Sequence, residues 1–281
     1  MLHNQVHAGN SSSRFAGVPS PVLSVEFAQR SDCGRVRDHN EDYLGHVTPQ
    51  DELQTRRRGW LFTVADGVGG RERGEVASRM AVENIAAGFL RSTAAEAHTA
   101  LLARLVQAAN SAVYEAGQGA MATTVVACAL RFDRVAVAHV GDSRCYLIRR
   151  GVARSLTRDH TVGNEQLSLG SLSAPGMDKA ALKHVLSRAV GTDMFVASEV
   201  SEHLLLPDDL LLLCSDGLHG ALSSADLGRM VVQTRDLEAA VEQLVEAANE
   251  RDGSDNVTVQ LIRVRTVERV GMYRGRPYRL R

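Results

Sequence analysis

Cysteine is scarce in this 281-residue sequence, and no two cysteines form a C-x-x-C pair. The four cysteines are Cys33, Cys128, Cys145 and Cys214. Three of them lie inside apolar runs, where a free thiol behaves as a small hydrophobic side chain. We therefore expect neither a disulfide framework nor a zinc knuckle, and this cysteine usage favours a reducing, cytoplasmic compartment.

An excess of one charge is also missing, as is an apolar run long enough to cross a membrane. The chain carries 32 Lys and Arg against 33 Asp and Glu, for a formal net charge of -1. Nonspecific nucleic-acid binding needs a clustered basic surface, and residues 1–20 lack the apolar core of a signal peptide. We expect neither a nucleic-acid partner nor a membrane association.

The composition, with 44% hydrophobic residues, is sufficient for a large core. We expect a Ser- and Gly-rich disordered leader over residues 1–21, a folded domain over residues 22–265 and a basic tail over residues 266–281. Within the domain, residues 158–183 are rich in Gly and Ser and poor in large apolar side chains. This segment is expected to be a mobile excursion on the surface.

The order of the expected elements indicates an α+β fold, because strands and helices follow one another without regular β-α-β alternation. Apolar residues at helical spacing predict helices over residues 75–92, 94–116, 224–233 and 236–250. Period-two, β-branched or continuously apolar segments predict strands over residues 22–32, 59–66, 208–217 and 256–264, and an antiparallel meander over residues 122–157. Gly117 and Gly119 suit a left-handed C-cap for the second helix.

Acidic residues recur where the expected strands end. The four such turns carry Asp66 in VADGVGG, Asp142 in HVGDSR, Asp216 in LLCSDGL and Asp255 in GSDNVT, and a fifth element, HNEDY, carries Glu41 and Asp42. Each Asp-Gly dipeptide alone is an ordinary turn. Several converging carboxylates, however, repel one another unless cations neutralise them. Oxygen ligands without paired Cys or His favour Mg²⁺ or Mn²⁺ over zinc or copper.

A phosphate ester is the natural substrate of a site with two cations, because two ions can activate a water and screen an in-line displacement. Gly67 has no side chain, so its carbonyl can approach a metal closely. Arg37 precedes the HNEDY element, and arginine binds phosphate oxygens bidentately. Considered alone, Arg37 is an ordinary surface arginine.

The motifs, taken in order, resemble the PP2C-type (PPM) protein serine/threonine phosphatases, particularly the compact bacterial members. The resemblance extends from about Val22 to Val264 and includes SDCGRVRDHNEDY, TVADGVGGRERGEVAS, ATTVVACAL, AHVGDSRCYLIRRG, LTRDH, LSRAVG, LLLCSDGL and DGSDNVTV. It implies an α-β-β-α sandwich of two antiparallel sheets flanked by helices. It also implies hydrolysis of phosphoserine and phosphothreonine by a water activated between two Mn²⁺ or Mg²⁺ ions, with a weaker third ion.

The resemblance further implies a role for each matching residue. Asp66 would bridge the two ions, with the Gly67 carbonyl on one of them. Asp216 and Asp255 would hold the first ion, and Glu41 and Asp42 would serve the second, partly through water. Arg37 would bind the phosphate, Asp142 with Asp216 would support the third ion, and Asn256 would steady its loop.

Three features depart from the family pattern. Val68 stands where many eukaryotic members have a histidine proposed as general acid, and His39 is the nearest candidate by sequence. Gly220 stands where some members have a further aspartate ligand for the third ion. Residues 158–183 correspond to the family's flap segment, and their unusual composition suggests distinctive substrate selection.

Alternative readings remain open. A catalytically weak pseudophosphatase acting as a binding module would keep the fold, but every principal carboxylate is present here. A metal-dependent nuclease would need a basic groove, and the C-x5-R match at Cys128 lacks the glycine-rich loop of a cysteine phosphatase. The expected partners are phosphoproteins, in particular bacterial Ser/Thr kinases and their substrates, and the expected state is a monomer.

Overall fold

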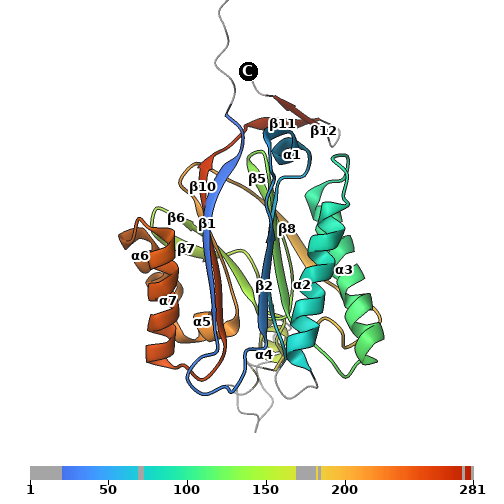
Figure 1. Cartoon of the computed structure of the whole chain (residues 1–281), viewed down its shortest axis with the longest axis vertical. Helices are drawn as coiled ribbons and strands as arrows, with labels where there is room; N and C mark the ends of the chain where they lie inside the picture. The colour runs from blue at the N-terminus through green and yellow to red at the C-terminus, as the bar shows by residue number, and fades with distance from the viewer. Residues whose placement is uncertain (1–20, 69–72, 169–181, 183–184, 274–275, 280–281) are drawn as a thin grey trace, which may run out of the picture.

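The computed structural model describes residues 21–68, 73–168, 182, 185–273 and 276–279. Almost all of the expected leader and much of the flap segment lie outside these ranges. Four layers make up the described domain (Figure 1), in the order helices, sheet, sheet, helices. The expected α-β-β-α sandwich is confirmed.

Each sheet of the sandwich has five strands, and neighbouring strands within each sheet are antiparallel. The first sheet has the order β1 (Ser24–Asp32), β10 (Val257–Thr266), β9 (Leu210–Cys214), β6 (Arg144–Arg149) and β7 (Val152–Ser155). The second has the order β2 (Asp42–Val47), β3 (Trp60–Asp66), β4 (Val125–Arg131), β5 (Arg134–Val140) and β8 (Glu199–Leu204).

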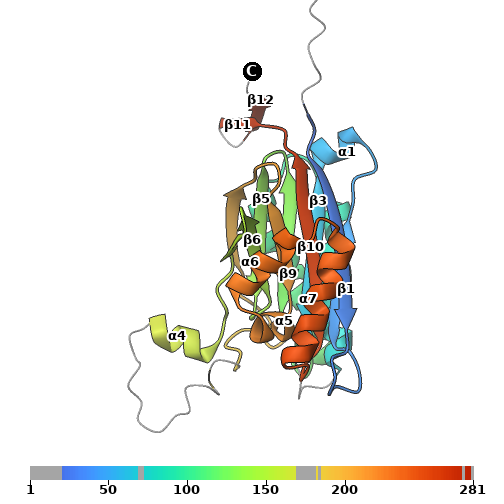
Figure 2. The same ribbon diagram turned by 90° about the vertical axis from the view of Figure 1, so that its left-hand side faces the viewer.

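Helices cover the outer face of each sheet. The second sheet packs against α2 (Gly74–Leu90) and α3 (His98–Gly117), and the first against α5 (Asp216–Ala221), α6 (Ser224–Gln233) and α7 (Leu237–Arg251). The short helices α1 (Glu52–Arg57) and α4 (Val162–Ser168) lie outside these layers, and Figure 2 shows α4 standing away from the sandwich. A hairpin of β11 (Val270–Tyr273) and β12 (Arg276–Arg279) follows the last long strand.

Burial on both faces explains the apolar sequence of the central strands. In β3, Leu61 and Ala65 pack in the core beneath α2 and α3, whereas Phe62 and Val64 pack between the two sheets. Successive side chains of a strand point to opposite faces. A strand covered on both faces is therefore apolar at nearly every position, which is why the segment has no polar alternation.

The predictions from the sequence identified most of the long helices and strands and did not identify the short ones. The helices expected over 224–233 and 236–250 are α6 and α7, and the helix expected over 94–116 begins later, at His98. The left-handed residue that ends α3 is Gln118, with φ of 48°, followed by Gly119 at 82°. The expectation for Gly117 was wrong, because the helix continues through that residue. No pattern had indicated α1, α4, α5, β2, β8 or the β11–β12 hairpin.

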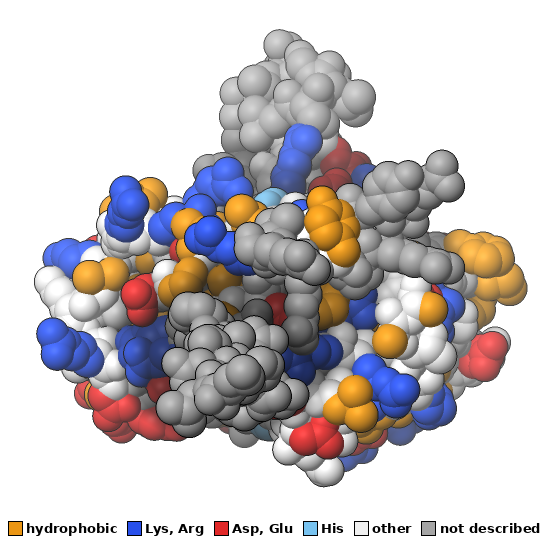
Figure 3. Space-filling model, turned by 90° about the horizontal axis from the view of Figure 1, so that it is seen from above, with side chains coloured by type: hydrophobic (Ala, Val, Ile, Leu, Met, Phe, Trp, Pro, Cys, Tyr) orange, Lys and Arg blue, Asp and Glu red, His pale blue; other side chains and the backbone are white. Residues whose placement is uncertain are grey.

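The four cysteines are free thiols, and Cys128, Cys145 and Cys214 are buried as expected. Within the described ranges, no helix is both long and apolar enough to span a membrane. Figure 3 looks onto the end of the molecule that carries the hairpin. On that face the described basic side chains are spread among acidic and apolar ones and form no single patch.

Candidate active site

Carboxylates from both sheets meet at the end of the sandwich opposite the hairpin. Asp66 is the last residue of β3, Asp216 begins α5 two residues after the end of β9, and Asp255 precedes β10. Asp142 follows β5. These four carboxylates, together with Arg37 and Gly67, line a cavity of about 740 Å³. Residues far apart in the sequence thus share one site, as the strand-end positions predicted.

Glu41 and Asp42 lie beside this cavity and are not among the described residues that line it. Asp42 is paired with Asp66 across the β2–β3 ladder. The carbonyl of Glu41 accepts hydrogen bonds from Gly67 N at 3.1 Å and from Ser78 Oγ at 2.6 Å. The two acidic residues are therefore anchored to β3, to the turn that follows it and to α2.

Gly67 occupies a position with no room for a side chain. A Cβ there would lie 2.5 Å from the carbonyl carbon of Gly74 and 2.8 Å from the carbonyl oxygen of Glu41. Because these neighbours are backbone atoms, they cannot rotate away. The glycine lets β3, the acidic loop and the start of α2 approach one another, which keeps the Gly67 carbonyl at the cavity wall.

Asn256 joins the two loops that carry Arg37 and Asp255. Its Oδ1 accepts from Glu41 N at 2.8 Å, and its Nδ2 donates to the carbonyls of Cys33 at 3.0 Å and His39 at 3.1 Å. Ser215 makes a similar link, donating from Oγ to Asp42 Oδ2 at 2.7 Å. Ser215 was not identified from the sequence, although its position directly before Asp216 in the SDG motif was a usable signal.

The cluster of carboxyl groups carries more negative charge than the surrounding protein compensates. Burial raises the pKa of Asp42 to about 7, although hydrogen bonds from Ser215 and Thr258 oppose the shift. Burial, followed by repulsion from Asp216, raises the pKa of Asp142 to about 7. The pKa of Asp66 is raised well above its ordinary value by burial and by the neighbouring aspartates. Such shifts arise where like charges converge away from water.

These residues fit a pair of hard divalent cations. The described residues that line the cavity include no His or Cys, and the metal ligands they offer are oxygens of carboxylates and of the Gly67 carbonyl, which Mn²⁺ and Mg²⁺ prefer. Asp42 Oδ1 is buried and has no hydrogen-bond partner among the described residues. Cations would supply the positive charge that the raised pKa values show to be lacking.

Arg37 reaches the cavity and forms an ion pair with Asp255, with Nη2 2.9 Å from Oδ2. Its side chain is 42% exposed, so it remains accessible to a ligand. The attraction of Asp255 raises the pKa of the guanidinium, which is charged in any case. Arg37 is therefore placed beside the carboxylates, where a phosphate held by cations would lie within its reach.

The residues that depart from the family pattern can now be placed. Val68 lines the cavity. The side chain of His39 is 72% exposed, and its Nε2 lies 3.8 Å from Glu41 Oε1, so it borders the acidic element. Gly220 lies in α5, and a Cβ built there meets no atom within 4 Å. The space beside Gly220 would therefore accept a larger side chain.

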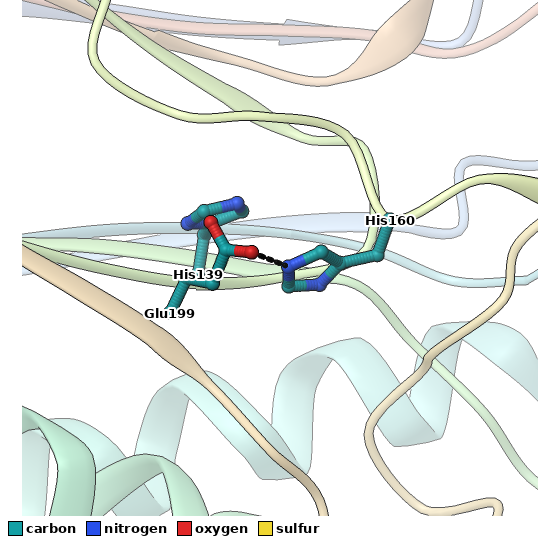
Figure 4. A group of neighbouring side chains, drawn as sticks. All are labelled: His139, His160 and Glu199. Carbon is teal, nitrogen blue, oxygen red and sulfur yellow. Dashed lines mark ion pairs between the residues drawn. The ribbon is translucent and has the colours of Figure 1, made fainter. Parts of the chain in front are cut away.

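A second group of metal-ligating residue types comes from β5, β8 and the segment before α4 (Figure 4). Donor atoms of His139, His160 and Glu199 lie within 4.8 Å of one another. The two imidazole rings are stacked, however, with centroids 4.6 Å apart and planes inclined by 19°. Lone pairs that lie in two nearly parallel ring planes cannot converge on one ion.

The hydrogen bonds of His160 indicate a structural role. Its Nδ1 accepts from Gly141 N at 3.2 Å, which leaves the proton on Nε2, 3.4 Å from Glu199 Oε1. A metal-bound histidine would instead donate from its second nitrogen. Burial lowers the pKa of His160 to about 4, so the ring is neutral near pH 7. His160 N also donates to Gly141 O at 2.9 Å, which fixes the turn that presents Asp142.

Known proteins resemble this chain over most of its length. A family model described as protein phosphatase 2C matches residues 36–261. The serine/threonine phosphatase stp of Listeria innocua is 34% identical over 262 residues, which cover 90% of this chain and 99% of that protein. The solved S. agalactiae serine/threonine phosphatase superposes with a TM-score of 0.76 and 31% identity, covering 86% of this chain and all of that chain, 100%.

A further solved structure is relevant to the cations. The catalytic domain of the serine/threonine protein phosphatase PstP, in complex with two manganese ions, superposes with a TM-score of 0.71 and 29% identity. The superposition covers 87% of this chain and 100% of that chain. The similarity therefore extends over the whole domain that carries the cavity.

Proposed function

The chain belongs to the protein phosphatase 2C family, and we propose that it is a metal-dependent hydrolase that removes phosphate from phosphoserine and phosphothreonine in proteins. The observation that carries this function is the convergence of Asp66, Asp216 and Asp255 with Arg37 in one cavity. Two manganese or magnesium ions would complete the site. When bound, they activate a water as the nucleophile and screen the charge of the phosphoryl group.

The carboxylates would divide between the two ions. Asp66 would contribute to both, and Asp216 and Asp255 would hold the first. The Gly67 carbonyl, Glu41 and Asp42 would serve the second, partly through water. Asp42 supports this arrangement through its hydrogen bond from Ser215, which directly precedes Asp216.

Arg37 and Asp255 form an ion pair, with Nη2 2.9 Å from Oδ2. A cation bound by Asp255 would compete with this half-exposed guanidinium, because the charge of the cation is higher and more compact. Arg37 would then be available to donate two hydrogen bonds to the nonbridging oxygens of the phosphate and to orient the phosphoryl group.

The proposal extends to the partners and the place of action. Phosphoproteins are the substrates, with Ser/Thr kinases and the proteins they phosphorylate as the expected members, and the enzyme acts as a cytoplasmic monomer without nucleic-acid or membrane partners. Three buried free thiols support a reducing compartment. The balanced charge of the chain, formally -1, supports the absence of a nucleic-acid partner.

Hydrolysis assays with matched variants test this function. The wild-type protein is expected to hydrolyse p-nitrophenyl phosphate and phosphopeptides with Mn²⁺ and to lose this activity in EDTA. Asp66→Asn and Asp216→Asn should each lower kcat/KM by about 100-fold or more, because loss of a ligand exceeds the effect of an outer-shell change. Asp51→Asn is the control, because Asp51 caps α1 outside the site and asparagine also caps helices.

The same assays separate the alternative. A pseudophosphatase would bind Mn²⁺ and phosphopeptide without turnover. Full activity in either site variant would contradict the assignment of the carboxylates.

A further inference from the structure

The segment that forms one wall of the active-site cavity continues into two exposed apolar side chains. Thr192 and Asp193 line the cavity. The next two residues, Met194 and Phe195, are 59% and 78% exposed. We call this pair the apolar rim. Val185, at the start of the same wall, also lines the cavity and is 48% exposed. Apolar surface thus borders a cavity whose lining is rich in carboxylates.

The backbone of the apolar rim is held by side chains of α3. Asn110, which is fully buried, donates from Nδ2 to the carbonyls of Asp193 at 2.9 Å and Met194 at 3.1 Å. Gln107 donates from Nε2 to the Met194 carbonyl at 3.1 Å and accepts from Val196 N at 3.2 Å. Both sides of the rim are therefore tied to a rigid helix.

The start of this segment is equally constrained. Gly191 N donates to Asn110 Oδ1 at 2.8 Å. Gly191 has a φ of +95°, and a Cβ there would lie 2.4 Å from Val113 Cγ1 and 2.7 Å from the Met121 carbonyl oxygen. Tight packing and fixed hydrogen bonds prevent the backbone from turning Met194 and Phe195 inward. Their exposure is built into the fold.

Exposed apolar side chains on a rigid loop are typical of interaction surfaces, since aromatic and Met side chains are enriched at interface cores. Here the location identifies the occupant. A phosphorylated side chain that enters the cavity brings the polypeptide on either side of it across the cavity edge. The cavity volume of about 740 Å³ also exceeds what one phosphoryl group needs, since pockets of roughly 300–1,000 Å³ hold whole drug-sized ligands.

We propose that Met194 and Phe195 form a substrate-recognition subsite that binds an apolar side chain flanking the phosphoserine or phosphothreonine of a protein substrate. This inference rests on the proposed phosphatase function and adds a preference in sequence to it. The contact lies away from the reacting atoms, so it contributes equally to the bound substrate and to the transition state. Such uniform binding lowers KM and leaves kcat unchanged.

The test combines a double variant with paired substrates. Met194→Ser/Phe195→Ser removes the apolar rim, and Val232→Ser is the matched control because Val232 is 57% exposed on α6 and outside the cavity lining. The substrates are p-nitrophenyl phosphate and pairs of phosphopeptides. The two peptides of a pair differ at one position near the phosphoserine, which is Leu in one and Ser in the other, and the pairs cover positions on both sides of the phosphoserine.

The expected result is selective. For at least one position, the wild-type enzyme and the control variant should have a KM roughly five- to twentyfold lower for the Leu peptide than for its Ser counterpart, because burying an apolar side chain favours binding. The double variant should lose this difference at unchanged kcat. Its kcat/KM for p-nitrophenyl phosphate should equal that of wild type, since this substrate has no flanking residues.

Two other results would overturn the inference. Wild type could treat every Leu and Ser pair alike, or the double variant could keep the preference. If the double variant kept the preference and its sedimentation coefficient changed, the rim would instead be a self-association surface. Failure of the proposed function looks different, because wild type would then not hydrolyse p-nitrophenyl phosphate with Mn²⁺.

Discussion

Replacing Asp142 with asparagine is expected to stabilise the ion-free protein while it weakens the response to manganese. Asp142 is buried beside Asp216, and its pKa is raised from 3.8 to about 7 by burial first and by that neighbour second. One pKa unit corresponds to 1.36 kcal/mol, so the ionised carboxylate destabilises the fold by up to roughly 4 kcal/mol above pH 7. Asparagine has a similar shape and no charge to desolvate.

The sign of the pH dependence follows from proton uptake. Between about pH 4 and pH 7 the folded protein holds a proton on Asp142 that the unfolded chain has lost. The free energy of unfolding of the wild type therefore falls as the pH rises through this window. The Asn variant lacks this contribution, so its advantage is absent below about pH 4 and complete above pH 7.

Urea denaturation in EDTA at pH 5 and pH 8 measures this advantage. Asp142→Asn should exceed wild type in the free energy of unfolding at both pH values, and by more at pH 8. With saturating Mn²⁺ the order should reverse or the gap should close, because cation binding stabilises the wild type in proportion to its affinity. The electrostatic reasoning would be refuted if the difference in free energy of unfolding between Asp142→Asn and wild type were the same at pH 5 and pH 8. It would also be refuted if the variant were less stable than wild type in EDTA at pH 8.

Three further substitutions probe separate parts of the site. Arg37→Ala should lower kcat/KM for phosphopeptides by about 100-fold and weaken inhibition by inorganic phosphate, and the values for Arg37→Lys should lie between those of Arg37→Ala and wild type. Unchanged inhibition by phosphate would show that Arg37 does not bind it. Gly67→Ala should lower the free energy of unfolding by roughly 1–3 kcal/mol in thermal or urea melts, since its Cβ would meet backbone atoms of Gly74 and Glu41; a melt identical to wild type would show that the turn has room. Gly220→Asp should tighten Mn²⁺ binding measured by calorimetry, because the space beside Gly220 is open and the new carboxylate would lie one turn after Asp216 in α5. An unchanged binding isotherm would show that this side chain does not reach the ion site.

The sequence predicted those site residues that lie at the ends of strands. An apolar segment followed by an acidic turn predicted that β3 ends at Asp66 and that Asp216 follows β9, and the structure has both. These patterns are local, since burial on both faces and the turn chemistry of Asp-Gly are written in neighbouring residues.

Contacts between distant segments were beyond such patterns. Arg37 pairs with Asp255, 218 residues away, and Asn256 joins its loop to Cys33 and His39 through hydrogen bonds that depend on the tertiary arrangement. Periodicity indicates that a segment is a strand and leaves its partner open.

Elements at the edges of the sheets were not predicted from the sequence, for a related reason. β8, with the sequence EVSEHL, is a half-exposed edge strand next to β5, so its polar side chains hide the apolar signal on which sequence patterns depend. The apolar rim was missed as well, because its meaning comes from the cavity beside it and from the α3 side chains that hold its backbone.

The most direct test of the central claim is one experiment on Asp66, which ends β3 at the cavity wall. Calorimetric titration with Mn²⁺ and phosphopeptide hydrolysis would be measured on the same preparations of wild type and Asp66→Asn. The account predicts that wild type binds at least two ions and turns over phosphopeptide in Mn²⁺ but not in EDTA, and that the variant loses both high-affinity binding and turnover. A variant that binds and hydrolyses like wild type would contradict it.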